Sequence, residues 1–442
     1  MSTTLLSIVR HTRRLSPIRL PRVRRGETTI SVREVRHGMR LGLFEAALAQ
    51  VFLTIAFGTI ATGLALLLGA RSFELGVLAA LPVIGSLLQF PAAWWVERHG
   101  HRRRLAVIGS LGRQLWLVPA LLLFLPLPTG VRMALFLGVL AVGHMLLAVA
   151  NNAWTSWMTD LIPSNVRGRY FGARGAVTGC VAIVLGCGGA SLIDYAKSTG
   201  LEAPTYAGLL VFTVVAGGLG SWLLARQPEP PKERTTTICL SDLCLMPLRH
   251  PSFRKFVGTF SLWNIGLGLG APFFIAYGLT ALNLPLRTLA LTETTTALCM
   301  MIAQPRWGAL ADRIGHNRVL RLCMAGVAPT PLLWLLASHD RVWPIFLASA
   351  IGGLMWAGIG TGQTSRMMEQ APEEGRAAFF AAFSAMTGLP FMLASMGAGA
   401  LMSAIGVNPV TVDGLTFHPY LMFFVASATV RLLAVILGWK AV

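Results

Sequence analysis

Five ionisable residues of this chain lie inside long apolar stretches, where little water is available to stabilise a charge. Arg113 and Arg431 keep their charge, whereas Glu45, His144 and Glu293 can gain or lose it. An ionisable group in such surroundings is energetically costly, and burial disfavours its charged form. A carboxyl or imidazole placed there suits the uptake and release of a proton. We therefore expect these three residues to be candidates for proton exchange, Glu293 above all; the alternative for each is permanent pairing or packing between helices.

Other kinds of chemistry have little support in the sequence. The six cysteines form no C-x-x-C pair and no cluster with histidine at the spacing of zinc ligands. The glycine-rich segments 266–270 and 358–362 lie within apolar stretches, and no lysine follows them as it would in a phosphate-binding loop. We expect no catalytic residue, no metal site and no bound cofactor, and hence a protein that is not an enzyme.

The apolar stretches predict a membrane protein. Hydrophobic residues make up 54% of the 442 residues and charged residues 12%, whereas about 25% of residues are charged in typical soluble domains. A helix of about 20 apolar residues can cross a bilayer, and such stretches recur twelve times along this chain. We expect an all-α, polytopic membrane protein with spans near 41–69, 74–96, 105–127, 131–158, 171–194, 205–225, 255–280, 287–310, 318–338, 342–365, 377–405 and 419–440.

Basic residues are distributed unevenly between the loops on the two sides of these spans. Thirty of the 37 Lys and Arg fall on the side that holds both termini, and the opposite loops hold five. Because cytoplasmic loops are enriched in Lys and Arg, we expect both termini in the cytoplasm and the chain in the inner (plasma) membrane. The net charge of +19 is then a topology signal at a face that meets anionic lipids, and no nucleic-acid partner is expected.

Two polar segments flank or divide the spans. Residues 226–254 combine proline, charge and a run of threonines, which predicts a cytoplasmic linker with six helices on either side. Residues 1–40 carry ten arginines, which favours a cytoplasmic tail on anionic lipid, with an organellar transit peptide as the alternative. The expected division is a tail at 1–40, a six-helix bundle at 41–225, a linker at 226–254 and a second bundle at 255–442.

An internal repeat relates the two sets of six helices. Residues 97–103 match residues 312–318 at an offset of 215, and residues 155–179 match residues 364–388 at an offset of 209. The first match follows the second and eighth helices, and the other begins near the ends of the fourth and tenth. Both are explained by two homologous six-helix halves that arose by duplication, a plan found in secondary transporters.

The turn after the eighth helix carries the motif by which the chain resembles a known family. Residues 308–318, GALADRIGHNR, are similar to the G-x-x-x-D-R-x-G loop of the major facilitator superfamily. The matching turn after the second helix departs from it, with Ala93 and Glu97 in place of the glycine and the aspartate. Together with twelve spans and a mid-chain linker, the resemblance implies two pseudo-symmetric six-helix bundles that work by alternating access.

The resemblance also implies gating loops whose charges hold one access state and release it during transport. The alternative is that these charges only anchor the loops and set the topology. The first latch would comprise Glu97, Arg98, Asp160 and Arg167, and the second Asp312, Arg313, Glu369 and Arg376.

Substrate-cavity residues follow from the helices that line the central cavity in that family. In this sequence those helices carry uncharged amide and indole side chains, which suit an amphiphilic or aromatic organic solute. The alternative is that the same side chains join neighbouring helices. The candidates are Gln50, Asn151, Asn152, Trp154, Trp263, Asn264, Trp356 and Gln363.

The function expected from the resemblance is secondary active transport of a small organic solute, coupled to protons and directed outward. Two alternatives stay open: an uncoupled facilitator or uptake permease, and a non-transporting sensor or assembly protein on the same scaffold. The expected partners are the solute, protons and the lipid bilayer, and the expected state is a monomer.

Overall fold

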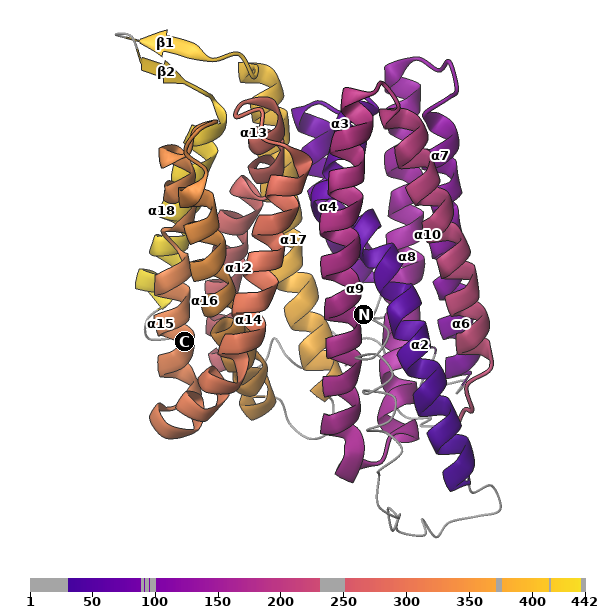
Figure 1. Ribbon diagram of the computed structural model, residues 1–442. Coiled ribbons are helices and arrows are strands. Elements are labelled where there is room, and N and C mark those ends of the chain that lie inside the picture. The colour runs from indigo at the N-terminus through magenta and orange to yellow at the C-terminus, as the bar shows by residue number, and fades with distance from the viewer. Residues whose placement is uncertain are drawn as a thin grey trace.

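The computed structural model describes residues 31–88, 91, 95, 101–230, 251–370, 376–412 and 415–438. Nearly all of these residues are helical, and the helices run roughly side by side in two adjacent bundles (Figure 1). The expected all-α fold of two six-helix bundles is confirmed. Glu97 and Arg98, expected in the first latch, lie outside the described residues.

The first bundle, called the N half below, contains six expected spans, two of them interrupted. The first span is divided into α2 and α3, and the third into two α-helices joined by a 3-10 helix. The elements are α2 (Val32–Ala56), α3 (Gly58–Leu67), α4 (Ser72–Leu87), α6 (Arg102–Ser110), η2 (Leu111–Trp116), α7 (Leu117–Leu122), α8 (Thr129–Leu161), α9 (Ser164–Ser198) and α10 (Glu202–Ala225).

The second bundle, the C half, repeats this plan and adds one feature. A short antiparallel hairpin, β1–β2, lies between the last two helices, where the sequence had predicted only a loop. The elements are α12 (Pro251–Gly270), α13 (Phe273–Thr280), α14 (Leu286–Ile314), α15 (His316–Val327), η4 (Thr330–Leu336), α16 (Trp343–Gln370), α17 (Arg376–Ile405), β1 (Val410–Val412), β2 (Leu415–Phe417) and α18 (Tyr420–Gly438).

The interruptions recur at equivalent places in both halves. The first span breaks at Phe57 and Gly58, and its counterpart in the C half breaks between α12 and α13, at Ala271 and Pro272. The third span passes through η2, and its counterpart passes through η4. Helix interruptions conserved by position within one chain support the duplication inferred from the sequence repeat.

Ten described helices are long and apolar enough to cross a membrane. α4 has 16 residues, fewer than the about 20 that a bilayer span needs. α14 is long enough but is not among the ten, because its sequence contains Glu293, several threonines, Gln304 and Arg306. A span so rich in polar residues is costly in hydrocarbon and marks a functional element.

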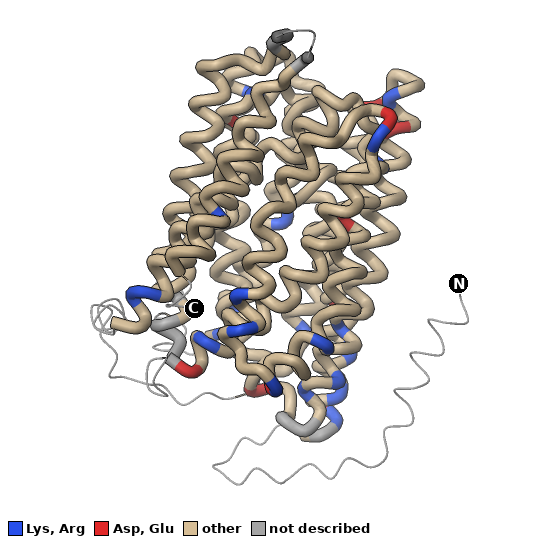
Figure 2. Tube along the Cα trace, turned by 90° about the vertical axis from the view of Figure 1, so that its left-hand side faces the viewer, with Lys and Arg blue, Asp and Glu red and all other residues tan. Residues whose placement is uncertain are grey.

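Lys and Arg gather at one end of the molecule, the lower end in Figure 2. α2 begins and α18 ends there, and we call it the basic end. α2 begins at Val32 rather than near residue 41, as was expected. The charged residues of its first turns are basic, with the exception of Glu34. The other end of the molecule is called the opposite end.

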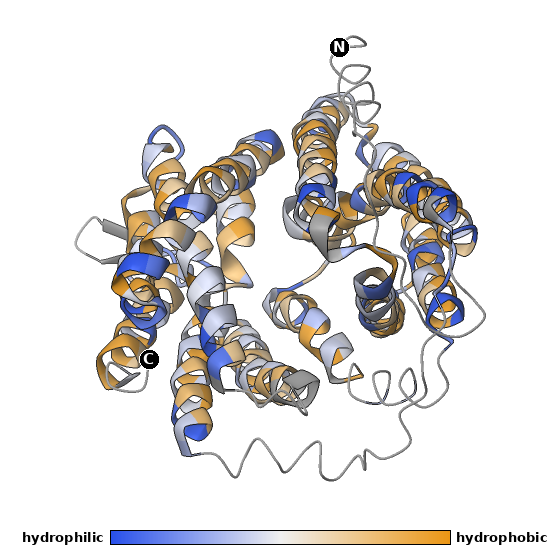
Figure 3. Cartoon of the chain, turned by 90° about the horizontal axis from the view of Figure 1, so that it is seen from below, coloured by the Kyte–Doolittle hydropathy of each residue, from blue (hydrophilic) through white to orange (hydrophobic). Residues whose placement is uncertain are grey.

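The two halves are packed together at the opposite end. Their most extensive contacts join α4 to α17 and α9 to α14, a pseudo-symmetric pair of helix crossings. One buried apolar cluster combines side chains of both halves, such as Leu64 and Phe273. At the basic end, by contrast, one cluster belongs to the C half alone and another to the N half alone. Seen from that end, the halves form separate groups of helices (Figure 3).

Glycines allow the α4–α17 crossing to be close. A Cβ at Gly76 would lie 2.5 Å from the backbone oxygen of Ser395, and one at Gly399 would lie 2.6 Å from that of Ser72. Ser395 Oγ also donates a hydrogen bond of 2.9 Å to the Gly76 carbonyl. This close backbone contact fixes the two halves against each other at the opposite end.

Candidate functional site

The break in the first span leaves a helix N-terminus without a local partner. Gly58 has φ +63°, a left-handed conformation that glycine adopts without strain, and α3 begins there. The first N–H groups of a helix have no acceptor within it. Phe57, the N-cap of α3, supplies no side-chain hydrogen bond. An acceptor must therefore come from elsewhere in the molecule.

Glu293 of α14 supplies that acceptor from the C half. Its Oε1 accepts a hydrogen bond of 3.0 Å from the Thr59 backbone N–H. Gly58 makes room for the carboxylate, since a Cβ at this position would lie 2.6 Å from the same oxygen. The carboxylate faces the partial positive charge of the α3 N-terminus, which stabilises a negative group. One residue of the C half thus caps a helix of the N half.

His144 of α8 contacts the same break from within the N half. Its ring meets the ring of Phe57 edge-on, with the ring centroids 4.9 Å apart. The backbone of His144 lies against α4, where a Cβ at Gly85 would come within 2.6 Å of the His144 carbonyl oxygen. Two of the three candidates for proton exchange, Glu293 and His144, are therefore gathered at one position.

Glu45 lies on α2 about three turns closer to the basic end. It is 2% exposed and forms two ion pairs, of 3.2 Å with Arg113 and 3.3 Å with Arg174. Arg174 also donates to the Gly42 carbonyl at 2.9 Å. Glu45 therefore joins α2, η2 and α9 within one half, which is the geometry of a structural ion pair rather than of an open proton site.

Arg174 connects this ion-pair cluster to a candidate cavity residue. Its guanidinium lies 4.3 Å from the centre of the Trp154 ring, a cation–π contact. The expected fifth span, 171–194, would place Arg174 in the first turn of the helix. α9 begins at Ser164 instead, so Arg174 lies three turns into the helix and reaches Glu45.

Asp194 forms a second carboxylate cap between the halves, which the sequence did not suggest. Its two carboxylate oxygens, from α9 in the N half, accept hydrogen bonds of 2.9 Å each from the backbone N–H groups of Leu286 and Arg287. These residues form the first turn of α14 in the C half. Asp194 and Glu293 therefore make reciprocal contacts, each capping a helix of the other half.

A cavity of about 670 Å³ lies beside the Asp194 cap, between the two halves. Its lining includes Lys197, Glu202 and Tyr206 from the N half, and Asn283 and Arg287 from the C half. None of the eight residues expected in a substrate cavity lines it.

Those eight residues lie away from this cavity, on helices of both halves. Trp263 and Trp356 of the C half meet edge-on at 6.2 Å between ring centroids. Gln50 Nε2 donates a hydrogen bond of 3.2 Å to Thr54, and Asn264 donates one of 2.8 Å to a backbone carbonyl of its own helix. Asn151 is exposed, and the half-buried members of the set are Gln50, Asn152, Trp154, Asn264, Trp356 and Gln363.

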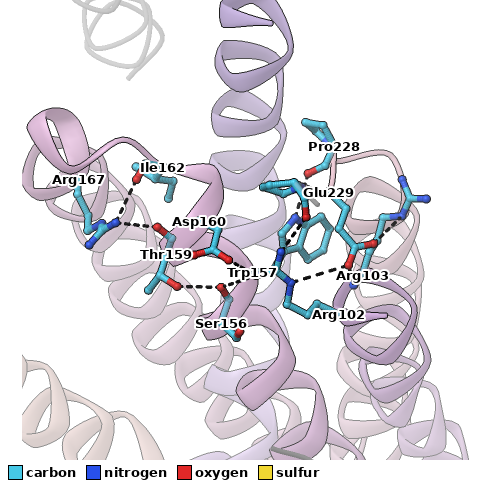
Figure 4. A network of polar contacts seen from close by, with 11 residues as sticks. Arg102, Arg103, Ser156, Trp157, Thr159, Asp160, Ile162, Arg167, Pro228 and Glu229 are labelled. Atoms are coloured by element: carbon cyan, nitrogen blue, oxygen red, sulfur yellow. Dashed lines mark hydrogen bonds and ion pairs between the residues drawn. The ribbon is translucent and has the colours of Figure 1, made fainter. Parts of the chain in front are cut away.

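The loops of the N half at the basic end form one polar network (Figure 4). Arg102 is fully buried. It forms an ion pair with Asp160 and donates a hydrogen bond of 3.1 Å to the Ser156 carbonyl. Arg167 donates instead to the carbonyls of Thr159, at 2.7 Å, and Ile162, at 3.3 Å. Asp160 and Arg167, expected in one latch, therefore have separate partners, and the sequence missed Arg102 as the partner of Asp160.

The same network holds the start of the linker between the halves. Trp157 Nε1 donates a hydrogen bond of 2.9 Å to the Pro228 carbonyl, and Arg102 donates one of 2.8 Å to the Pro230 carbonyl. The backbone N–H of Arg103 donates a hydrogen bond of 3.1 Å to the Glu229 carboxylate (Figure 4). The linker is therefore docked on the N half through residue 230.

The corresponding loops of the C half contain fewer contacts among the described residues. Asp312 and Arg313, at the end of α14, are exposed. Glu369 pairs with Arg366 on its own helix at 3.1 Å. The side chain of Arg376 lies outside the described residues.

Comparison with known proteins identifies the relationships of this chain. The family model for the Major Facilitator Superfamily matches residues 44–291 and 256–441. A mutant of the nucleoside transporter NupG is similar in structure, with a TM-score of 0.71 and 10% identity over 92% of this chain and 99% of that one. A bacterial homologue of the iron transporter ferroportin, in an inward-facing state, is also similar. Its TM-score is 0.65, with 13% identity over 93% of this chain and 99% of that one.

The xylose transporter XylE from E. coli, in a partially occluded inward-open conformation, is also similar. Its TM-score is 0.58, with 12% identity over 92% of this chain and 95% of that one. No curated protein matches the sequence.

Proposed function

The chain belongs to the major facilitator superfamily, and we propose that it is a proton-coupled secondary transporter that exports a small organic solute. Two six-helix halves would rock about a central site and expose it to one side of the membrane at a time. The packing supports this proposal, because the halves share an apolar cluster only toward the opposite end and have separate clusters at the basic end.

The contact between Glu293 and Thr59 is the observation that carries the proton-coupling proposal. It joins the halves through an ionisable group, so a change in protonation alters the energy of the contact itself. An ionised carboxylate at a helix N-terminus is stabilised by typically 0.3–1 kcal/mol, and by up to about 2 kcal/mol in partly buried geometries. Protonation removes that charge and weakens the link between α3 and α14.

The protonation state of Glu293 would therefore bias the balance between joined and separated halves at the opposite end. With Glu293 ionised, the halves stay joined there and a solute can enter from the basic end. When the halves separate, the carboxylate loses the α3 N-terminus and takes up a proton as the solute leaves. The protonated protein then returns and releases the proton at the basic end.

His144 is the second candidate for the proton path, because its ring rests on Phe57 at the same break. A proton on the imidazole would add a positive charge close to the helix N-terminus that the Glu293 carboxylate caps. The two groups would therefore influence each other's protonation. Glu45, buried between Arg113 and Arg174, is assigned a structural role instead.

The proposed solute is an uncharged or amphiphilic organic molecule. The candidate cavity residues offer amides for orientation and indole rings for apolar contact, with Trp263 beside Trp356 as one such surface. Two proteins of similar structure are named as transporters of a nucleoside and of xylose. Nucleosides and sugars without phosphate groups match this description.

Charged loops at the basic end are proposed to close that end when the opposite end opens. Asp312 and Arg313 are exposed in this structure, so they are available to form contacts as the halves approach. Asp160 is already held by Arg102, which makes the N-half network the fixed side of such a closure. The positive charge of this end also supports a cytoplasmic location for both termini, in a plasma membrane.

Reconstitution into liposomes tests the proposed function. A panel of uncharged organic solutes, including nucleosides and pentoses, is tested in vesicles, and both efflux and accumulation are followed with and without an imposed pH gradient. Flux that depends on the gradient supports coupling. Flux that ignores the gradient indicates a facilitator, and no flux across the panel indicates a sensor or assembly protein.

The Glu293→Gln variant identifies the coupling residue in the same assay. It is expected to lose gradient-driven accumulation and to retain exchange of solute for solute. Asp340→Asn is the matched control, since Asp340 is an exposed carboxylate at the opposite end. Accumulation that is unchanged in Glu293→Gln would reject the assignment.

A further inference from the structure

The first two turns of α2 form a capped helical segment at the basic end. Ser31 is the N-cap, and its hydroxyl accepts a hydrogen bond of 3.2 Å from the Glu34 N–H. The Glu34 carboxylate in turn accepts one of 2.8 Å from the Ser31 N–H. This capping box satisfies two N–H groups at the helix start. The segment is therefore a defined helix with its own start.

One face of this segment packs against the docked linker. A Cβ at Gly38 would lie 3.0 Å from Pro228 Cδ and 3.2 Å from Leu161 Cδ2, so α2 fits closely here. Met39 and Leu43, farther round the helix, pack against the apolar cluster at the basic end of the N half. The position of this segment is thus tied to the position of the linker.

The other face carries four basic side chains at helical spacing. Arg33, Arg36, His37 and Arg40 follow the i, i+3, i+4, i+7 pattern that places residues on one side of a helix, and all four are exposed. None of the three arginines forms an ion pair or hydrogen bond with another described residue. Together with Glu34, they line an open hollow of about 730 Å³.

The acidic residue of this segment does not neutralise the basic face. Both the N–H and the hydroxyl of Ser31 donate to the Glu34 carboxylate, the hydroxyl at 2.7 Å. Glu34 keeps its negative charge, but Arg33, Arg36 and Arg40 outnumber it, so the exposed face stays positive overall. Among the described residues, none of these arginines has an ion-pair partner.

The basic face continues into one that suits the lipid acyl chains. Phe44 lies one turn beyond Arg40 along the same side of α2 and is 64% exposed. In a membrane-spanning helix an exposed phenylalanine contacts hydrocarbon. Arg40, His37 and Arg33 follow at successive turns toward the basic end, which places them at the level of the lipid head groups.

We propose that Arg33, Arg36, His37 and Arg40 form a binding surface for the phosphate groups of anionic phospholipids in the leaflet at the basic end. Each Lys or Arg near such a surface contributes about 1 kcal/mol of attraction. Because the opposite face of the segment packs on Pro228, lipid binding also stabilises the docked start of the linker. Anionic lipid content then controls how firmly the linker is held on the N half.

Hydrogen–deuterium exchange on the full-length protein tests this proposal. The protein is reconstituted in vesicles of phosphatidylcholine, with or without phosphatidylglycerol, and exchange is followed in residues 31–43. Phosphatidylglycerol is expected to slow exchange by at least about tenfold, as three arginines at the surface imply. Raising the salt concentration is expected to reduce the effect, because salt screens exposed charges. Equal exchange in both kinds of vesicle would overturn the proposal.

Two further arms separate lipid binding from other causes. The triple variant Arg33→Gln, Arg36→Gln, Arg40→Gln is expected to lose the protection. A matched triple variant removes the same charge from other exposed sites and is expected to keep the protection; its substitutions are Arg104→Gln, Arg169→Gln and Arg254→Gln. Protection that survives in the first variant contradicts the assigned surface. Soluble glycerol phosphate is expected to give no protection, and equal protection by it would show that a free phosphate rather than a lipid is the ligand.

Discussion

The carboxylate of Glu293 in the C half lies 3.0 Å from the backbone nitrogen of Thr59 in the N half. This contact depends on a helix break at Gly58, on the missing side chain of that glycine, and on the packing of α14 against the N half. It places an ionisable group where the two halves meet. Protonation of one residue can therefore change how strongly the halves are joined.

Replacement of Asp194 by Asn is expected to favour separation of the halves at the opposite end. Asn keeps one acceptor oxygen for the Leu286 and Arg287 N–H groups but loses the charge that the α14 N-terminus stabilises, worth about 1 kcal/mol. The equilibrium should shift about fivefold. Electron–electron distance measurements between spin labels at Ser198 and Val407 report the separation, and a wild-type distribution would argue against the cap.

Replacement of Gly76 by Ala is expected to prevent the close crossing of α4 and α17. The added Cβ would lie 2.5 Å from the Ser395 backbone oxygen, which cannot move away as a side chain could. Spin labels at Ser198 and Val407 should then report a longer distance. Gly397→Ala on α17 is the matched control, since its Cβ meets nothing within 4 Å. Equal behaviour of the two variants would contradict the crossing as described.

Replacement of Glu45 by Gln is expected to lower the free energy of unfolding by about 3–5 kcal/mol, because Arg113 and Arg174 lose their buried counter-charge. Glu369→Gln, which breaks an exposed pair with Arg366, should cost no more than about 1 kcal/mol. Reversible denaturation in SDS, followed by circular dichroism, measures both variants. Comparable losses would show that Glu45 is not a buried structural pair.

Replacement of Arg102 by Gln is expected to release the start of the linker. The guanidinium is fully buried and holds both Asp160 and the Pro230 carbonyl. Amide exchange across residues 224–230 should accelerate by at least about tenfold, as the loss of two hydrogen bonds to a charged group implies. Arg103→Gln, whose side chain is half exposed, should have a smaller effect, and the reverse order would contradict the assigned roles.

Much of the fold followed from the sequence because hydrophobic segments and charged loops are local signals. The all-α fold of two helical bundles needed only runs of apolar residues, while the linker at 226–254 and the duplication stay predictions from composition and from the repeat. The hairpin was missed although Asp413-Gly414 stands between Val-Thr-Val and Leu-Thr-Phe, two runs of β-branched, aromatic and apolar residues, a pattern typical of a hairpin turn. Helix starts were also misplaced at Val32 and Ser164, where polar or basic turns extend a span beyond its apolar part.

The site was only partly predictable from the sequence. Glu293 was found because a carboxylate in an apolar stretch is conspicuous. Its partner was not found, because a backbone N–H becomes available only where a helix breaks, and the contact requires two halves that are distant in sequence. Asp194 and Arg102 carry no local signal of their partners for the same reason, since both are charged residues near the ends of spans.

The dependence of the inter-half distance on pH tests the central claim most directly. Because Glu293 joins α14 to the N-terminus of α3 through an ionisable group, the balance between joined and separated halves should depend on pH. The distance between labels at Ser198 and Val407 is therefore predicted to change with pH in the wild type and in Asp340→Asn, and to be independent of pH in Glu293→Gln. A Glu293→Gln protein that keeps the wild-type pH response would contradict proton coupling through this residue.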